Sequence, residues 1–258
     1  MNIVVTNDDG LNTPGIWTMA ESLTQVGNVS VVAPDREQSG KGMGITFTLP
    51  VRVSEAIPRI EGVKALAVEG TPADSVILAV QGLTPSPVDL VVSGINEGGN
   101  TGHNVLVSGT VGAAFQAHFW NIPAIAVSVV GTKDFRFEVG ARIAAVLARM
   151  FRDGILSGPM LLNVNVPSVP LEEIDGVMIT RLARGNYRDT LEKVDSVKHD
   201  YYWLARGKVE WMEEEGTDIW AVRRNRISVT PLHLELTSDV TSPLLAEFAP
   251  TILQELMG

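Results

Sequence analysis

The feature that most constrains this chain is the alternation of short apolar runs with amphipathic segments. The apolar runs are too short for buried helices, and the segments between them repeat their apolar residues at helical spacing. Strands that alternate with helices form βαβ units, whose strands lie parallel in one sheet. We therefore expect an α/β fold: a Rossmann-like, largely parallel sheet flanked by helices, with a carboxy-terminal β-hairpin excursion.

The pattern also predicts where the elements begin and end. The predicted strands cover residues 3–6, 29–33, 63–68, 88–92, 124–129, 160–164 and 227–230, with an alternating, antiparallel stretch at 45–53. The predicted helices cover residues 14–26, 72–82, 111–119, 137–152 and 243–256. Thr13, Thr71 and Thr110 are the predicted N-caps of the first three helices.

Composition narrows the function classes. The chain has no cysteine, which excludes disulfide frameworks, cysteine-based zinc sites and thiol nucleophiles and fits a reducing compartment. Its formal net charge is −10, so we expect no binding to nucleic-acid polymers, and an anionic substrate must be held by a metal ion or by backbone dipoles. We find neither a signal-peptide pattern nor an apolar run long enough for a membrane span, and we expect a cytoplasmic protein.

Two adjacent carboxylates, Asp8 and Asp9, follow the first predicted strand. Ligands of an open parallel sheet bind beyond the carboxyl ends of its strands, where these two residues are placed. Adjacent like charges repel, so a hard divalent cation beside them is the simplest explanation. The alternative is that both side chains form an Asx-turn that caps the loop.

Two further loops are predicted at the same edge of the sheet. Residues 34–44 supply the Ser39 hydroxyl, and residues 93–109 supply the Asn96 amide. With the two aspartates they make an all-oxygen donor set that suits one Mg²⁺ or Mn²⁺ ion. Ser108, Gly109 and Thr110 precede a predicted helix, whose amide groups form an anion cradle. Together these residues indicate hydrolysis of a phosphate ester.

Several motifs make the chain resemble the survival protein SurE family, in order and in spacing. They lie at residues 5–10, 33–40, 70–74, 93–96, 108–111, 201–204, 216–218 and 228–232. The resemblance implies a divalent-metal-dependent 5′/3′-nucleotidase acting on nucleoside monophosphates, in some members also an exopolyphosphatase. It further implies a Rossmann-like core and an exchanged carboxy-terminal hairpin in a homodimer or homotetramer.

By that resemblance the metal ligands are Asp8, Asp9, Ser39 and Asn96, with the two aspartates catalytic. Asp8 or Asp9 orients the attacking water, and direct attack by a carboxylate is the alternative. The expected phosphate contacts come from six residues: Ser39, Gly40, Asn96, Ser108, Gly109 and Thr110.

The chain departs from the family pattern at three positions near these motifs. Family members usually carry an acidic residue at the place of Asn104, an aromatic residue or histidine at Val107, and often glutamate at Gln116. These departures change no expected metal ligand, but they bear on loop polarity and substrate fit. His103 lies in the same glycine-rich loop and is a candidate substrate contact.

The expected organisation has three parts. Residues 1–183 form the catalytic core, residues 184–226 form the protruding hairpin region, and residues 227–258 form a returning strand and a carboxy-terminal helix. The main alternative to an enzyme is a metal-dependent nucleotide sensor that uses the same pocket without turnover. A phospho-receiver module would need an aspartate at the end of a middle strand, and a dehydrogenase would need GxGxxG after the first strand; the chain has neither.

Overall fold

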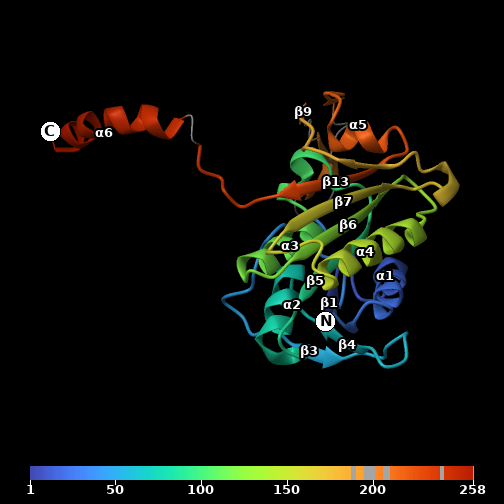
Figure 1. Ribbon diagram of the computed structural model, residues 1–258. Helices are drawn as coiled ribbons and strands as arrows, with labels where there is room; N and C mark the ends of the chain where they lie inside the picture. The colour runs from blue at the N-terminus through green and yellow to red at the C-terminus, as the bar shows by residue number, and fades with distance from the viewer. Residues whose placement is uncertain (187–189, 195–200, 206–209, 239–240, 258) are drawn as a thin grey trace.

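A nine-stranded sheet forms the centre of the molecule (Figure 1). The computed structural model describes residues 1–186, 190–194, 201–205, 210–238 and 241–257. Along the sheet the strands follow the order β3-β4-β2-β1-β5-β6-β7-β13-β8. Their bounds are β1 Asn2–Thr6, β2 Asn28–Pro34, β3 Val53–Glu55, β4 Lys64–Val68, β5 Leu90–Glu97, β6 Ala124–Val130, β7 Leu161–Pro167, β8 Val177–Ile179 and β13 Ile227–Leu232.

The strands from β4 to β7 all pair in parallel, in the order β4-β2-β1-β5-β6-β7. This is the strand order of a doubly wound Rossmann-like sheet, so the predicted fold class is confirmed. The order reverses between β1 and β5, and the loops that follow these two strands diverge there. The returning strand β13 joins the same sheet, antiparallel to β7.

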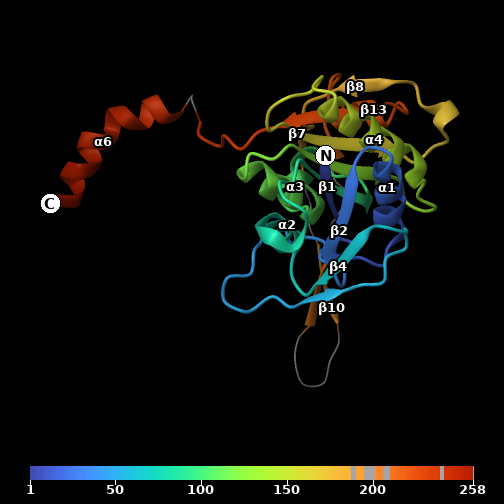
Figure 2. The same ribbon diagram turned by 60° about the horizontal axis from the view of Figure 1, so that its bottom comes forward.

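Helices cover both faces of the sheet (Figures 1 and 2). Helices α1 (Pro14–Thr24) and α4 (Phe137–Arg152) pack together on one face, and α2 (Pro72–Leu78) and α3 (Gly109–Phe119) pack together on the other. Each pair closes its own apolar core over the sheet. The shorter helices are η1 Ala79–Leu83, η2 Gly102–Leu106, η3 Leu171–Glu173 and α5 Asp218–Val222.

Three local predictions differ from the structure. Within the stretch 45–53 only Val53 belongs to a strand, β3, which pairs antiparallel with β4. Strand β5 continues to Glu97, so Asn96 lies on a strand and not in the predicted loop. Helix α3 begins at Gly109, and its N-cap is Ser108, whose hydroxyl accepts a hydrogen bond from the Val111 amide. Thr110 is therefore not the cap, because the helix starts one residue before it.

The carboxy-terminal part extends from this body in two places. Strands β10 (Thr190–Val194) and β11 (Tyr201–Ala205) form an antiparallel hairpin, and the short strands β9 (Gly185–Asn186) and β12 (Glu210–Trp211) pair at its base. Helix α6 (Thr241–Met257) lies away from the body in both views (Figures 1 and 2). Among the helices in the described ranges, none is both long and apolar enough to cross a membrane.

Candidate active site

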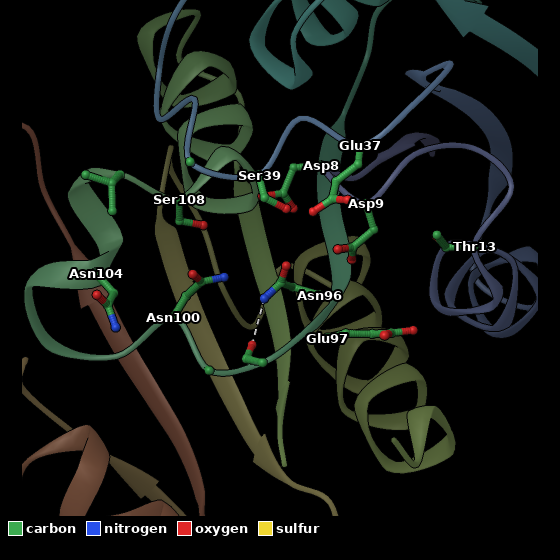
Figure 3. Close-up of a pocket in the computed structure, with 14 residues that line it drawn as sticks. Asp8, Asp9, Thr13, Glu37, Ser39, Asn96, Glu97, Asn100, Asn104 and Ser108 are labelled. Carbon is green, nitrogen blue, oxygen red and sulfur yellow. Dashed lines mark hydrogen bonds between the residues drawn. The ribbon is translucent and has the colours of Figure 1, made fainter. Parts of the chain in front are cut away.

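A pocket of about 650 Å³ opens where the strand order reverses, between the ends of β1 and β5 (Figure 3). It brings together six of the eight predicted site residues: Asp8, Asp9, Ser39, Gly40, Asn96 and Ser108. The other two, Gly109 and Thr110, lie behind the pocket wall and are buried. The three loops predicted to meet at this edge of the sheet therefore do meet.

The two adjacent aspartates are held in different environments. Asp8 is only 3% exposed, and burial raises its pKa against the effect of several hydrogen bonds that lower it. Burial, followed by the charge of Asp8, raises the pKa of Asp9 to about 7. The Oδ2 atom of Asp9 is buried without a hydrogen-bond partner in the described part of the chain. Burying such an oxygen costs free energy unless a ligand or an ion binds to it.

The amino terminus of α3 forms hydrogen bonds with the carboxylate of Asp8. The Thr110 hydroxyl donates to Oδ1 of Asp8, and hydrogen bonds from the Gly109 and Thr110 amides lower the pKa of the same carboxyl. Thr110 has no solvent-exposed surface, so its hydroxyl does not reach the pocket. The predicted anion cradle therefore exists, but the anion in it is the carboxylate of Asp8, since a helix amino terminus stabilises any negative charge placed there.

Gly109 is required by this close approach. A Cβ atom at Gly109 would lie 2.7 Å from the Cβ atom of Asp8 and 2.9 Å from its Oδ2 atom. A second glycine on α3, Gly112, permits the loop at 34–44 to pack against the helix, because a Cβ there would lie 2.2 Å from the carbonyl oxygen of Gly42. This packing, with the hydrogen bond from the Gln38 amide to the Asp8 carbonyl (2.7 Å), brings Ser39 next to Asp8 (Figure 3).

The orientation of Asn96 is fixed by its own backbone neighbourhood. Its Nδ2 atom donates to the Gly98 carbonyl at 2.7 Å. The amide oxygen then lies on the side of Asp8 and Asp9 (Figure 3). Because a metal needs the oxygen and not the nitrogen, this hydrogen bond selects the rotamer that a cation requires.

These four side chains fit a hard divalent cation. Two carboxylates, one hydroxyl and one amide oxygen converge, and one carboxylate oxygen lacks a partner. The described residues contain no cluster of three or more histidine, cysteine, aspartate or glutamate side chains that could hold a metal. A metal at this place would therefore depend on the two neutral oxygen donors as well as on the two aspartates.

The charges around the pocket also favour a bound cation. Asp8, Asp9, Glu37 and Glu97 line it, and the fourteen lining residues of the described chain include no lysine or arginine. Arg36 instead pairs with Asp35 at 3.1 Å and is largely exposed. These carboxylates would repel a phosphate group unless a cation neutralised some of their negative charge.

Eight lining residues were not among the predicted metal ligands and phosphate contacts. They are Thr13, Glu37, Glu97, Gly98, Gly99, Asn100, Asn104 and Val107. Glu37 and Glu97 could have been found, because each stands within two residues of a predicted ligand. Asn104 and Val107, two of the departures from the family pattern, face the pocket, whereas His103 and Gln116 are not among its lining residues.

Comparison with known proteins shows which family the chain belongs to. A model of the family "Survival protein SurE" matches residues 3–189. The "5'-nucleotidase SurE" of Geobacter sulfurreducens is 46% identical over 247 residues, covering 95% of this chain and 92% of the relative. The relative of the same name from Dehalococcoides mccartyi is 43% identical over 238 residues, covering 92% and 90%. The crystal structure of the SurE protein from Aquifex aeolicus superposes with a TM-score of 0.80 at 37% identity, covering 96% of this chain and 99% of that one. With this agreement in sequence and fold, the chain belongs to the survival protein SurE family.

Proposed function

We propose that this protein is a metal-dependent phosphatase that hydrolyses nucleoside 5′-monophosphates to nucleoside and phosphate. Relatives named 5'-nucleotidase SurE are 42% to 46% identical over 92% to 95% of the chain. The observation that carries the proposal is the pocket itself, where the described lining residues include four carboxylates and no basic side chain around a space of about 650 Å³. Such a site can take a phosphomonoester only together with a cation.

In this proposal Asp8, Asp9, Ser39 and Asn96 hold one divalent ion, Mg²⁺ or Mn²⁺. When bound, the ion supplies positive charge to the phosphate oxygens and lowers the pKa of water. The support is the convergence of these four groups and the unpartnered oxygen of Asp9. The number and identity of the ions are part of the proposal.

The protein side chains divide the remaining work. Asp8 is engaged by Thr110 and by the amide groups of α3, so it keeps its position through the reaction. Asp9 has the oxygen without a partner, and we assign to it the orientation of the attacking water. Ser39, Gly40, Asn96 and Ser108 line the pocket and hold the phosphate oxygens.

Phosphate release from a panel of substrates tests this proposal. The panel contains 5′- and 3′-nucleoside monophosphates, polyphosphate and glycerol phosphate, each with EDTA, Mg²⁺ or Mn²⁺. We expect release from the 5′-monophosphates that EDTA abolishes and a divalent ion restores. Asp8→Asn should be inactive, while the control Asp35→Asn, outside the pocket, should keep its activity. Binding of a nucleotide and a metal ion without turnover would support a sensor and contradict the phosphatase.

We also propose that the protein forms a homodimer in which α6 packs on a second copy. None of the residues of α6 is buried, and its large apolar side chains are 51% to 82% exposed. These side chains are Leu244, Leu245, Phe248, Ile252, Leu253, Leu256 and Met257. Burying each of them contributes about 1.5 to 3 kcal/mol, so an isolated helix of this kind in water is strongly disfavoured.

Sedimentation of three variants tests the dimer. The wild type and the control Glu247→Ala should sediment as a dimer, or as a tetramer if the hairpin makes a further interface. A chain that ends after Thr237 should be monomeric or insoluble, and Phe248→Asp should weaken association. A truncated protein that sediments like the full-length chain would contradict this assembly.

A further inference from the structure

Asp218 is a buried charge that the reaction described above does not use. It is the first residue of α5, has no solvent-exposed surface, and does not line the pocket. Its carboxylate accepts three backbone hydrogen bonds, from the amides of Gly102 (2.8 Å), Ala183 (2.9 Å) and Ile219 (2.8 Å). Burial raises its pKa, and these hydrogen bonds act in the opposite direction. Burying a carboxylate costs free energy, so a buried aspartate at this place indicates that its contacts have a role.

Capping of α5 is not that role. The hydroxyl of Thr217 accepts the hydrogen bond of the Trp220 amide and occupies the N-cap position. An aspartate in the first turn of a helix can remain exposed and still favour the helix. The contacts that need a buried carboxylate at this place are those with Ala183 and with Gly102, and Gly102 is 116 positions away in the sequence.

Gly102 begins the part of the chain that forms one wall of the pocket. It is the first residue of η2, and the Asn104 carbonyl in this turn accepts hydrogen bonds from the Val107 and Ser108 amides, both at 3.1 Å. Asn104, Val107 and Ser108 all line the pocket. The position of the Gly102 amide therefore sets the position of these three residues.

A second anchor holds the same segment two residues earlier. Asn165 on β7 accepts from the Asn100 amide (2.9 Å) and donates to the Asn100 carbonyl (3.0 Å). Asn163 donates to that carbonyl at 2.8 Å, and the Asn100 side chain donates to Ser128 on β6 at 2.9 Å. Three glycines, Gly98, Gly99 and Gly102, lie in this segment. They would give it much conformational freedom if the two anchors were absent.

Asp218 also connects this wall of the pocket to the chain segments on either side of the short strands β9 and β12. Its amide donates to the Arg181 carbonyl (3.0 Å), and the Arg181 amide donates to the Gly216 carbonyl (3.0 Å). With its bonds from Ala183 and Gly102, the carboxylate thus ties residue 183 and the first turn of α5 to the pocket wall.

We propose that Asp218 is a positioning residue, which holds residues 98–108 in the shape that places Ser108 against the substrate phosphate. This inference rests on the proposed phosphatase function. By this inference, a residue of the carboxy-terminal segment supports a site whose lining residues lie in the amino-terminal half of the chain.

The isosteric variant Asp218→Asn tests the proposal. An amide can still accept the bonds from Ala183 and Ile219 through its oxygen, but its NH₂ group then faces the Gly102 amide, donor against donor. We expect kcat/KM for a nucleoside monophosphate to fall about tenfold or more, since a displacement of about 1 Å at a reacting group has effects of this size. Hydrogen exchange at the amides of residues 102–108 should become faster. The Kd for Mn²⁺ should stay within about threefold, because the four proposed ligands do not contact Gly102.

Thr217→Ala is the matched control. It removes the cap of α5 and lowers the melting temperature through the same helix, but it leaves the Gly102 contact in place. At a temperature where both variants are folded, the control should keep kcat/KM within about twofold of the wild type. If Asp218→Asn does not fold, Asp218→Ala gives a second test, since it removes the acceptor of the Gly102 amide without placing a second donor against it.

The outcomes separate this inference from the proposed function. A wild type that releases no phosphate would contradict the phosphatase. An active wild type with an Asp218→Asn variant, or in its place an Asp218→Ala variant, that matches the Thr217→Ala control in kcat/KM and in hydrogen exchange would contradict the positioning role. Loss of kcat/KM with retained Mn²⁺ affinity and faster exchange at residues 102–108 would establish it.

Discussion

Replacing Asp9 by asparagine should make the metal-free protein more stable while it destroys activity. The pKa of Asp9 rises from 3.8 to about 7 on folding, through burial and through the charges of Asp8, Glu97 and Glu37. A carboxyl whose pKa is higher in the folded state lowers stability as pH rises, because the unfolded chain loses its proton first. The destabilisation begins near pH 4 and is complete above pH 7. Asparagine carries no charge and avoids this cost at every pH.

The size of the effect follows from the pKa. The rise in the pKa of Asp9 from 3.8 to about 7 corresponds to about 4 kcal/mol, and solvent near this partly exposed side chain reduces this energy to about 2 kcal/mol. We therefore expect Asp9→Asn to raise the free energy of unfolding by about 2 kcal/mol at pH 8 and by less than about 1 kcal/mol at pH 4. Urea unfolding of EDTA-treated protein between pH 4 and pH 8 measures both values.

The matched control is Glu37→Gln. Glu37 lines the same pocket but is exposed, so its removal should change the stability only slightly. Addition of Mg²⁺ or Mn²⁺ should stabilise the wild type, and it should stabilise Asp9→Asn much less. A variant that is no more stable than the wild type at pH 8, or whose gain does not change with pH, would refute the reasoning.

Three further variants test single contacts of the site. Thr110→Val removes the hydroxyl donor to Asp8, so the pKa of Asp8 should rise further and the Kd for Mn²⁺ at pH 7 should increase about tenfold, measured by calorimetry. Gly109→Ala places a methyl group 2.7 Å from the Asp8 side chain and should lower the free energy of unfolding by about 1 to 3 kcal/mol in thermal or urea unfolding and abolish most phosphate release. Ser39→Ala alters an exposed hydroxyl, so unfolding should change by less than about 0.5 kcal/mol while kcat/KM falls at least about tenfold. Unchanged metal affinity, unchanged activity and unchanged kcat/KM, respectively, would contradict these assignments.

The sequence by itself determined the layered α/β architecture and most of the pocket. Hydrophobic periodicity is a local property, so the strands and helices of the core could be read from short windows, and helix 137–152 was predicted at its observed bounds. The parallel arrangement then forced the ends of β1 and β5 to one edge. Asp8, Asp9 and Asn96 converge for this reason, whereas Ser39 reaches Asp8 through the packing of residues 34–44 against α3.

Only the tertiary structure decided which way the polar groups at that edge point. The motif at residues 108–110 predicted an anion cradle, but its anion is Asp8, because α3 packs so closely that Gly109 touches that side chain. The bonds from Thr110 to Asp8 and from Gly102 to Asp218 join residues 102 and 116 positions apart. A hydrogen bond across such a separation depends on how the layers pack, and no local pattern of residue types carries that information.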